Sequence, residues 1–571
     1  MKEGDRKFDD VLYELGEFGR YQIVIFNLLC LLIFIAPWQT LGAVFISSDT
    51  DHWCKIPEWD SVDCDAHGFN TTWECSLAKR DVGIPWNYSA KNEKVYDRCH
   101  RYNVTGIEFS PDLNPKGLQT IGCNGGWMYY NEDPLTTTMN QDFDLVCGGE
   151  HFITLQQSLF FAGNAIGAIV GGTLSDKVGR HRVVFTALSI VSLAGIVVAL
   201  APNVWVMLGG RFIAGAASNA MVAATFVLAN EFVGPSKRSI SGNAIWVYCS
   251  LGYMLLALIA FFIRNWRHFY LIISAVPAIL LPLSVVVPES PRWLLSRDRE
   301  TEARKIVRKL AKVNKVTITE TFTLTDVTEK DVKKEDEKKF MDLLRKPRLR
   351  MYTLNIMFNL IVNTLVYFGV SLSTGSLGVN VYIAFAIAGA VEIPACFGVI
   401  HPIDYFGRRP SYMACMFIAG IALLATIFIP LGVGRACVAM VGKFAITSSF
   451  SIVYLHAVEI VPTPVRNEAL GACTLFSNMA NILGPQIIAL RSVWDPLPLV
   501  IFGSLSIIAG IVSVFLPETR GKKIPETIEE GENIGWRAGP RQRKGIQAVQ
   551  GSEYANIKYQ EANGMANGDP V

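Results

Sequence analysis

The sequence predicts an all-α membrane protein with twelve transmembrane helices in two pseudo-symmetric six-helix halves. First, 51% of its 571 residues are hydrophobic and the mean hydropathy is +0.30, which is too apolar for a soluble chain of this length. Second, twelve apolar stretches, most of them without a charged residue, are each long enough to cross a bilayer, which takes about 20 residues. Third, the same polar motifs occur twice along the chain at a nearly constant spacing.

The repeated motifs indicate that the chain consists of two related halves. The pattern Asp-x-x-Gly-Arg begins at Asp176 and again at Asp404, which follows 228 residues later (404 − 176). Two further motifs keep this spacing to within one residue: Glu231 and Arg238 recur as Glu459 and Arg466, and Pro288-Glu289-Ser290 recurs as Pro517-Glu518-Thr519. Three polar motifs in one order at one spacing predict two copies of one membrane-embedded unit, residues 21–288 and 351–516.

The chain begins with a polar N-terminus, residues 1–20, which we expect to be cytoplasmic. The uncharged run 21–48 follows. It is too long for the apolar core of a signal peptide, and no small-residue cleavage site follows it, so we expect it to be retained as the first span.

The polar loop 49–151 is predicted to be an extracellular module. It holds all the Asn-x-Ser/Thr sequons of the chain, which we expect to be glycosylated: Asn70, Asn87 and Asn103. It also holds half of the twelve cysteines: Cys54, Cys64, Cys75, Cys99, Cys123 and Cys147. Six cysteines in one polar loop indicate disulfides formed in an oxidising compartment, and their fifteen possible pairings stay open.

The remaining spans follow from the apolar runs. The first half continues with 152–175, 183–210, 212–230, 239–263 and 269–288, where a turn at Ala201-Pro202-Asn203 ends the third span. The charged loop 289–350 separates the halves. The second half consists of 351–372, 379–402, 410–433, 436–459, 469–490 and 496–516, and residues 517–571 form a tail. Twelve spans place both chain ends on the same side of the membrane.

The distribution of Lys and Arg predicts which side that is. Short loops after even-numbered spans carry eight of these residues, and short loops after odd-numbered spans carry four. Since cytoplasmic loops are enriched in Lys and Arg, both termini are expected in the cytoplasm, with the protein in the plasma membrane. The position of the sequons agrees with this orientation.

Two cytoplasmic segments have further predicted roles. The central loop contains an amphipathic helix whose basic face suits the inner leaflet or the neighbouring helix ends, unless it is a solvated helix without a partner. Its apolar positions are Ala303, Ile306, Val307 and Leu310. The tail from about residue 531 has a composition typical of disorder, and its end, Asp569-Pro570-Val571, is a candidate ligand for a scaffold domain that reads C-termini.

The paired motifs are candidates for a cytoplasmic latch that closes and opens as one half rocks against the other. Their charged side chains are placed to pair across helix ends: Asp176, Arg180, Glu231, Arg238, Asp404, Arg408, Glu459 and Arg466. Gly179 permits a tight turn in the first copy. The alternative is an ordinary set of positively charged loops with solvated side chains.

Three ionisable residues fall inside predicted spans, where a charge is costly and needs a reason. Arg211 and Lys443 occupy comparable positions, Gly-Arg-Phe and Gly-Lys-Phe, and we expect them to anchor the fourth and tenth spans. Glu392 has no counterpart in the first half. It is predicted either to attract a cation in a binding cavity or to be the structural partner of an Arg or Lys.

Aromatic and amide side chains within the spans are candidates for a cavity that binds an amine through cation–π contacts and hydrogen bonds. The candidates are Trp246, Tyr248, Tyr253, Tyr367, Phe368, Tyr454, Asn478 and Gln486. Packing is the alternative for each of them. No Walker loop, zinc-ligand spacing or catalytic constellation is present in the sequence, so we expect no enzyme activity, no metal, no cofactor and no nucleic-acid partner.

Several motifs resemble the major facilitator superfamily and, within it, the organic cation/carnitine/anion transporter family, solute carrier family 22. The resemblance covers about residues 8–530. It rests on Phe8-Asp9-Asp10-Val11-Leu12, Gly16-Glu17-Phe18-Gly19, Pro288-Glu289-Ser290-Pro291-Arg292-Trp293-Leu294, Tyr367-Phe368-Gly369, Val391-Glu392-Ile393-Pro394-Ala395 and the long cysteine-rich first loop. The resemblance implies that Tyr248, Tyr367 and Glu392 lie in the substrate cavity.

One departure from the family pattern bears on selectivity. Eleven positions after Val465-Arg466-Asn467, cation-selective relatives carry an acidic residue and anion or carnitine carriers a basic one, whereas this chain has the neutral Asn478. The resemblance therefore implies alternating-access transport, through the lipid bilayer, of small organic cations or zwitterions such as carnitine or amino-acid-derived amines. The alternatives are an organic anion transporter and a non-transporting surface receptor or scaffold. The coupling ion stays open.

Overall fold

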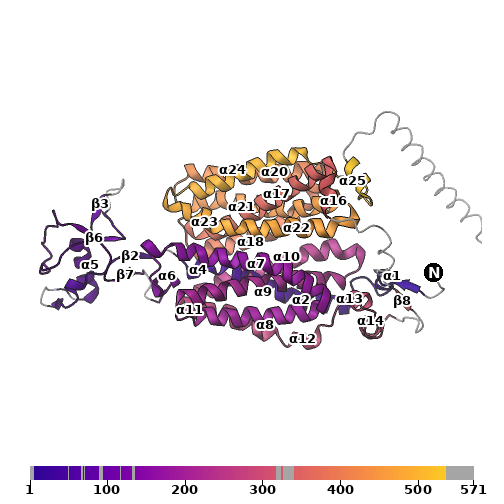
Figure 1. The fold of residues 1–571 in the computed structure, drawn as a ribbon, viewed down its shortest axis with the longest axis horizontal. Coiled ribbons are helices and arrows are strands. Elements are labelled where there is room, and N and C mark those ends of the chain that lie inside the picture. Colours follow the sequence, from indigo (N-terminus) through magenta and orange to yellow (C-terminus); the bar gives the residue numbers. More distant parts are fainter. Residues whose placement is uncertain are drawn as a thin grey trace, which may run out of the picture.

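The computed structural model describes residues 5–48, 50–65, 69, 71–88, 94–115, 117–131, 135–316, 323–325 and 340–534. Two helical bundles lie side by side, and a small module projects from one end of the N-terminal bundle (Figure 1). Asn70, most of the expected disordered tail and its last residues, Asp569-Pro570-Val571, lie outside the described residues. We call the end of the bundle that carries the module the module end and the opposite one the terminal end.

The described part of the chain contains twelve helical segments that are long and apolar enough to cross a membrane, as the sequence predicts. The N-terminal half consists of α2 (Arg20–Phe34) with α3 (Ala36–Leu41) and α4 (Ala43–Ile46), then α7 (His151–Val178), α8 (Arg180–Ala199), α9 (Val204–Glu231), α10 (Arg238–Phe262), and α11 (Trp266–Ala275) with α12 (Leu283–Val286). The C-terminal half consists of α17 (Pro347–Leu372), α18 (Val381–Gly398) with α19 (Ile400–Phe406), α20 (Arg408–Ala425), α21 (Val433–Ile460), α22 (Arg466–Ala480) with α23 (Gly484–Ala489), and α24 (Leu497–Val512).

The repeated Asp-x-x-Gly-Arg motif spans the junction of two helices, and only its glycine lies outside them. Helix α8 begins at Arg180 and α20 at Arg408, earlier than the 183 and 410 expected from the apolar runs. Gly179 and Gly407 have φ angles of +114° and +101°, a conformation that L side chains rarely adopt. A single glycine therefore reverses the direction of the chain. The charged residues on either side of it lie at the ends of two consecutive helices, close to one another.

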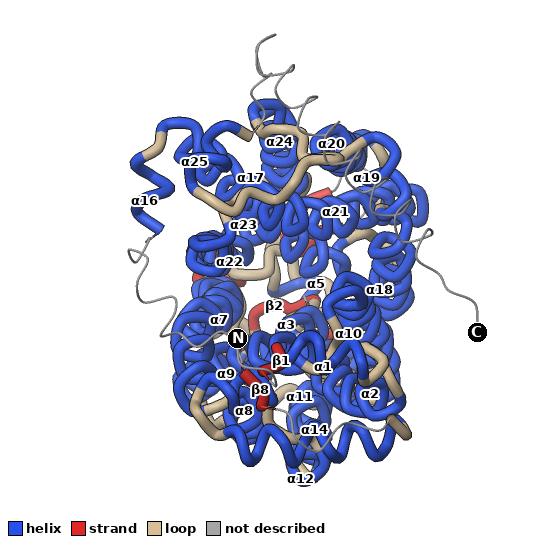
Figure 2. The backbone as a smooth tube through the Cα atoms, turned by 90° about the vertical axis from the view of Figure 1, so that its right-hand side faces the viewer, coloured by secondary structure: helices blue, strands red, loops and turns tan. Residues whose placement is uncertain are grey.

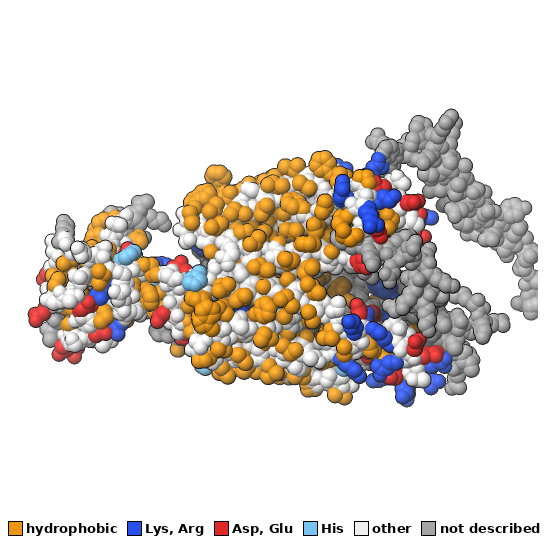
Figure 3. Space-filling view, viewed as in Figure 1, with side chains coloured by type: hydrophobic (Ala, Val, Ile, Leu, Met, Phe, Trp, Pro, Cys, Tyr) orange, Lys and Arg blue, Asp and Glu red, His pale blue; other side chains and the backbone are white. Residues whose placement is uncertain are grey.

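The two halves meet along two pairs of helices. Helix α10 packs against α18, and α7 packs against α22 and α23. Hydrophobic side chains cover the flank of both halves, and Lys, Arg, Asp and Glu gather at the terminal end (Figure 3). This distribution is that of a bundle whose sides face lipid and whose ends face water.

The cysteine-rich module has its own apolar core around Trp53 and Trp59 and is held by three disulfides: Cys54–Cys123, Cys64–Cys75 and Cys99–Cys147. It contains η1 (Pro57–Trp59), α5 (Thr72–Gly83) and short antiparallel pairs, β2 (Asp51–Cys54) with β7 (Trp127–Tyr130), β3 (Trp86–Tyr88) with β4 (Lys94–Tyr96), and β5 (His100–Tyr102) with β6 (Thr120–Gly122). Asn87 is exposed on β3 and Asn103 is half-buried after β5.

The module is attached to the N-terminal half. Helix α6 (Met139–Asp142) leads back into α7, and the Asn140 amide donates to the carbonyls of Ser47 and Ser48 at the end of the first span. The Asp142 carboxylate accepts hydrogen bonds from Trp266 Nε1 at 2.7 Å and Arg267 Nε at 2.8 Å. These contacts predict that the module moves together with the N-terminal half.

The terminal end carries the remaining short elements. Three short helices lie at the terminal end of the N-terminal half: α1 (Phe8–Glu14), α13 (Pro291–Ser296) and α14 (Glu300–Asn314). Strand β1 (Asp5–Lys7) pairs with β8 (Thr323–Thr325) in the same region. Helices α16 (Phe340–Arg345) and α25 (Ile528–Asn533) lie at the terminal end of the C-terminal half (Figure 2). The Glu532 carboxylate accepts hydrogen bonds from the backbone N–H groups of Arg348 and Leu349, so α25 caps the first turn of α17.

Candidate functional site

A buried charged cluster lies where α17, α18 and α21 meet. The Glu392 carboxylate is 2.8 Å from Lys443 Nζ and accepts a hydrogen bond of 2.7 Å from the Tyr367 hydroxyl. Lys443 also donates to Ser371 Oγ at 2.5 Å, and its ammonium lies 3.5 Å from the centre of the Tyr367 ring. The side chains of Lys443 and Glu392 are 1% and 5% exposed. Each charge thus has an opposite charge and further polar partners, which an ion pair needs when it is removed from water.

The same cluster reaches the other half of the protein. Ser250 on α10 donates to the second carboxylate oxygen of Glu392 at 3.1 Å. Tyr253, one helical turn further on, has its ring 5.8 Å from Lys443 Nζ. Glu392 is therefore bonded to both halves at once, and a separation of α10 from α18 must break its bond to Ser250.

The other predicted cavity residues lie at varying distances from this cluster. Tyr454 is connected to Tyr367 through Phe450, with ring centroids 5.3 Å and 5.7 Å apart. Tyr248 donates a hydrogen bond to Asn27 on α2. Trp246 is 40% exposed, and its ring packs 6.4 Å from that of Phe226.

Asn478 is half-buried on α22. The structure therefore unites Tyr367, Glu392 and Lys443 directly and Tyr454 indirectly, and it places Trp246 and Tyr248 on α10 of the opposite half.

Sequence reasoning missed three members of the cluster. Ser250, Ser371 and Phe450 contact Glu392, Lys443 and Tyr367 respectively. Small hydroxyl residues and Phe are common in membrane helices, so their types alone carry no functional signal. Ser371 lies one helical turn after Tyr367, a spacing that places both on one helix face and was the one available indication.

Arg211 has an environment unlike that of Lys443, although their local sequences match. Its guanidinium is fully buried and donates to the side chains of Gln156, Gln157 and Tyr270 and to the carbonyl of Gln39. No carboxylate among the described residues lies within ion-pair distance of it. Because its partners come from the first, second and sixth spans, Arg211 joins four helices of the N-terminal half.

The latch residues of the N-terminal half form a network at its terminal end. Arg180 lies 2.9 Å from the Asp176 carboxylate and 3.5 Å from that of Glu231. Arg238, another of the predicted latch residues, donates to the carbonyl of Val233 at 3.3 Å. Arg180 is therefore the residue on which both acidic side chains converge.

The C-terminal half repeats this network. Arg408 lies 3.9 Å from Asp404 and makes three hydrogen bonds of 3.0–3.2 Å to the Glu459 carboxylate. Arg466 donates to the carbonyl of Val461 and to Thr463. The two halves thus use equivalent residues, as the repeat predicts, but Arg180 lies closer to the aspartate of its motif and Arg408 lies closer to the glutamate.

A second pair of carboxylates, outside the predicted latch, completes both networks. Glu289 accepts a hydrogen bond from the backbone N–H of His181, and Glu518 accepts from those of Arg408 and Arg409. Each carboxylate thus binds the free N–H groups at the start of a helix, which also carry partial positive charge. The signal in the sequence was the repeated Pro-Glu-Ser/Thr motif at nearly the same spacing.

Glu518 lies just beyond the last span and is therefore in contact with water. Burial alone raises the pKa of its carboxyl, but hydrogen bonds from the backbone N–H groups of Arg520, Arg408 and Arg409 outweigh this effect and hold the pKa below its usual value. The carboxylate is consequently ionised, and its bonds to α20 are fully formed, throughout the neutral pH range.

The halves touch one another from the middle of the bundle towards the module end. Ser158 on α7 donates to the carbonyl of Ile482 at 2.8 Å and accepts a bond of 3.2 Å from Gln486. Aromatic pairs also cross the interface: Phe45 with Tyr382 and Phe385, Tyr253 with Phe385, and Phe161 with Phe368. Among the described latch residues, the ion pairs named above each stay within one half. The structure is therefore closed at the module end.

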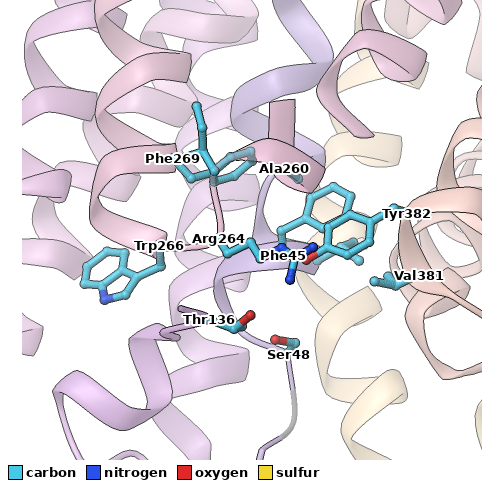
Figure 4. Close-up of a pocket in the computed structure, with 11 residues that line it drawn as sticks. Phe45, Ser48, Thr136, Ala260, Arg264, Trp266, Phe269, Val381 and Tyr382 are labelled. Atoms are coloured by element: carbon cyan, nitrogen blue, oxygen red, sulfur yellow. The ribbon is translucent and has the colours of Figure 1, made fainter. Parts of the chain in front are cut away.

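A small cavity lies at this closed end, behind the parallel rings of Phe45 and Tyr382, whose centroids are 5.7 Å apart (Figure 4). Arg264 and Trp266, near the start of α11, also line it. Its volume of about 40 Å³ is enough for one or two water molecules and too small for an organic substrate. The cavity therefore belongs to the closure of the module end.

Known proteins resemble this chain over nearly its whole length. A profile of the family described as "Sugar (and other) transporter" matches residues 132–530. The chain is 36% identical to the organic cation transporter protein of Drosophila melanogaster, over 98% of this chain and 99% of that protein. It is 33% identical to solute carrier family 22 member 3 of Rattus norvegicus, over 92% of this chain and 96% of the relative.

A human relative and a solved structure add to this picture. The chain is 31% identical to the organic cation/carnitine transporter 2 of Homo sapiens, over 92% of this chain and 94% of the relative. An inward open structure of the xylose transporter XylE from E. coli matches with a TM-score of 0.55 and 17% identity, over 70% of this chain and 93% of that chain. At this identity the structural match shows the fold.

The fold and the family matches define a multi-pass membrane transporter of the major facilitator superfamily, and not an enzyme. Within that superfamily, the chain belongs to solute carrier family 22, the organic cation/carnitine transporter family.

Proposed function

We propose that this protein transports small zwitterions, such as carnitine or amino-acid-derived amines, and organic cations of similar size. The observation that carries the proposal is the Glu392–Lys443 ion pair, which lies beside Tyr367 and contacts both halves. The relatives named for organic cations and for carnitine support the same class of substrate.

The charge balance of the cluster favours a zwitterion over a simple cation. Lys443 already neutralises Glu392, so a lone cation must displace the ammonium of Lys443 and leave it buried without a partner, which is costly. A zwitterion provides a new partner for each residue of the pair, because its ammonium group binds Glu392 and its carboxylate binds Lys443. The Tyr367 ring adds a cation–π surface for the ammonium group.

The contacts between the halves suggest how transport proceeds. We place the terminal end in the cytoplasm of a plasma-membrane protein, with the module outside and glycosylated, on the basis of the Lys/Arg distribution and the sequons. The structure then represents an inward-facing state. Breaking the contacts around Ser158 and Phe45, and the bond from Ser250 to Glu392, opens the opposite side and exposes the ion pair.

Uptake of three labelled probes tests this proposal: a quaternary cation, carnitine and a carboxylate anion, each with and without depolarisation by high K⁺. We expect carnitine uptake to exceed uptake of the other two. The variant Lys443→Gln should shift the preference towards the cation, because Glu392 then lacks its competing partner. Glu392→Gln should shift it towards the anion. Replacement of Na⁺ in the medium then identifies Na⁺ coupling.

The matched control is Arg435→Gln, which removes a positive charge from the same helix at its module end, where Arg435 lies 3.5 Å from Asp495. Its probe ratio should equal that of the wild type. If carboxylate uptake dominates in the wild type, the protein is an organic anion transporter. If none of the three probes enters cells that carry the protein on their surface, a receptor or scaffold role replaces transport.

A further inference from the structure

Helix α14 carries a row of basic side chains that the transport mechanism does not use. Lys305, Arg308, Lys309 and Lys312 are all exposed and follow the spacing i, i+3, i+4, i+7, so they form one stripe along the helix. We call this stripe the α14 basic face. The opposite side of the helix is apolar and buried, with Ala303, Val307, Leu310 and Ala311.

The α14 basic face is not balanced by acidic residues of its own helix. The two glutamates of α14 lie in its first turn and are paired: Glu300 with Arg304 at 2.7 Å and Glu302 with Arg299 at 2.7 Å. From residue 303 to 316 the sequence contains no Asp or Glu. In the described part of the chain, no carboxylate lies within ion-pair distance of the four side chains. The stripe is therefore a concentrated positive surface.

The position of α14 brings this surface to the level of the membrane boundary. Asn314, at the end of the helix, donates to Leu15 O at 3.1 Å and Gln22 Oε1 at 2.8 Å, and it accepts from the Tyr21 N–H at 3.0 Å. Lys309 Nζ lies 5.8 Å from the centre of the Tyr21 ring. Helix α14 is thus joined to the first turn of the first span.

The exposed apolar surface of the first span begins immediately beyond this point. The next turn of α2 exposes the apolar side chains of Ile23 and Val24, 40% and 54% exposed. Seen from the terminal end, α14 lies at the rim of the N-terminal half, beside α12 (Figure 2), where Lys and Arg gather at the limit of the hydrophobic band (Figure 3). Phospholipid headgroups occupy this level in a bilayer.

We propose that the α14 basic face binds anionic phospholipid headgroups of the adjoining leaflet. Lys and Arg clusters next to a span attract anionic lipids electrostatically, and the attraction weakens as salt screens it. Bound lipid would fix α14, and through Asn314 the start of the first span, at the membrane surface. In the orientation proposed above, this is the inner leaflet, which carries the negative surface charge.

The test compares the thermal unfolding of the full-length protein in nanodiscs of phosphatidylcholine alone and of phosphatidylcholine with added phosphatidylserine. The wild type should unfold several degrees higher with phosphatidylserine, and high NaCl should abolish this shift. The variant K305Q/R308Q/K309Q/K312Q should lose the shift and match the wild type in phosphatidylcholine alone. The measurement needs no transport and places the lipid on both faces, so it is independent of the proposed substrate and orientation.

The control K346Q/R350Q/K522Q/K523Q removes the same number of exposed positive charges at the terminal end of the other half and should retain the shift. An equal loss in this control, or a full shift in the α14 variant, overturns the proposal. A shift produced by inorganic phosphate in phosphatidylcholine alone overturns it in favour of a site for free anions. If the Gln variant is unstable without phosphatidylserine, the variant K305R/K309R/K312R replaces it in the test. This variant keeps the positive charge, so it must keep the rise in unfolding temperature, and loss of that rise overturns the proposal.

Discussion

Glu392 and Lys443 show how a single pair of charges can be tolerated inside a membrane protein. Either residue alone would be a buried charge with a large desolvation cost, and each is compensated by the other and by hydroxyl groups. Arg211 meets the same cost without a carboxylate, through neutral acceptors of four groups. One half thus holds a single charge among neutral polar groups, and the other holds the ion pair that we propose a substrate exchanges.

We predict that single substitutions of this pair destabilise the protein more than the double substitution. Glu392→Gln or Lys443→Gln leaves one buried charge without its partner, which costs about 3–5 kcal/mol in buried pairs of other proteins. E392Q/K443Q removes both charges and should recover most of the thermal stability, but not carnitine uptake. Thermal unfolding and uptake of the three variants provide the double-mutant cycle. Recovery of uptake in the double variant would show that the pair is only structural.

The duplicated networks at the terminal end join whole helices to one another. Arg180 and Arg408 each stand at the first position of a helix, and each gathers carboxylates from neighbouring helices. Glu289 and Glu518 bind the same helix starts through the backbone. Three helix ends in each half are therefore fastened together, so each half is able to move as one body.

We predict that Arg408→Ala slows transport more than Asp176→Asn, with normal surface expression of both. Arg408→Ala leaves Glu459, whose side chain is 15% exposed, without its main partner, and a loss of about 1.4 kcal/mol corresponds to a tenfold slower turnover. The Asp176 side chain is 71% exposed, and exposed ion pairs contribute little. Turnover rates normalised to surface protein give the comparison. Full uptake by both variants would contradict the latch.

The arrangement of the two halves defines the state that the structure represents. Contacts between them lie from the middle of the bundle to the module end, while the latch networks remain separate. The module is bonded to the N-terminal half, so we expect it to move with that half in the proposed rocking motion. Alternating access then requires the contacts at the module end to break in every cycle.

We predict that a covalent link across the module end stops transport. In the variant S158C/Q486C, a short bis-methanethiosulfonate, which forms a reducible disulfide with each thiol, should join α7 to α23, because the native side chains are 3.2 Å apart. Uptake should fall to background and return after reduction. N164C/N219C provides the control, since the Asn219 amide donates to the Asn164 carbonyl within one half, and its linkage should leave uptake intact. Continued transport by the linked S158C/Q486C protein would rule out rocking about this interface.

Much of this structure follows from local patterns in the sequence. Apolar runs predicted twelve spans, and the 228-residue spacing predicted two equivalent halves with equivalent charged networks. The charged residues inside the spans were identified as candidates for a special role from the sequence alone. An unpaired charge is costly in a bilayer, whatever the helix packs against. Such features depend on residue type and spacing alone, so the sequence was sufficient to predict them.

The pairing of Glu392 with Lys443, the bond from Ser250 and the three disulfides required the folded chain. Ser250 and Glu392 are 142 residues apart, and their contact depends on the rotation of α10 and α18 about their own axes. Hydrophobic periodicity shows that a helix crosses the membrane, but a helix that is apolar on all sides does not show which face meets a neighbour. Packing between helices decides those faces, and with them which charges become partners in the site.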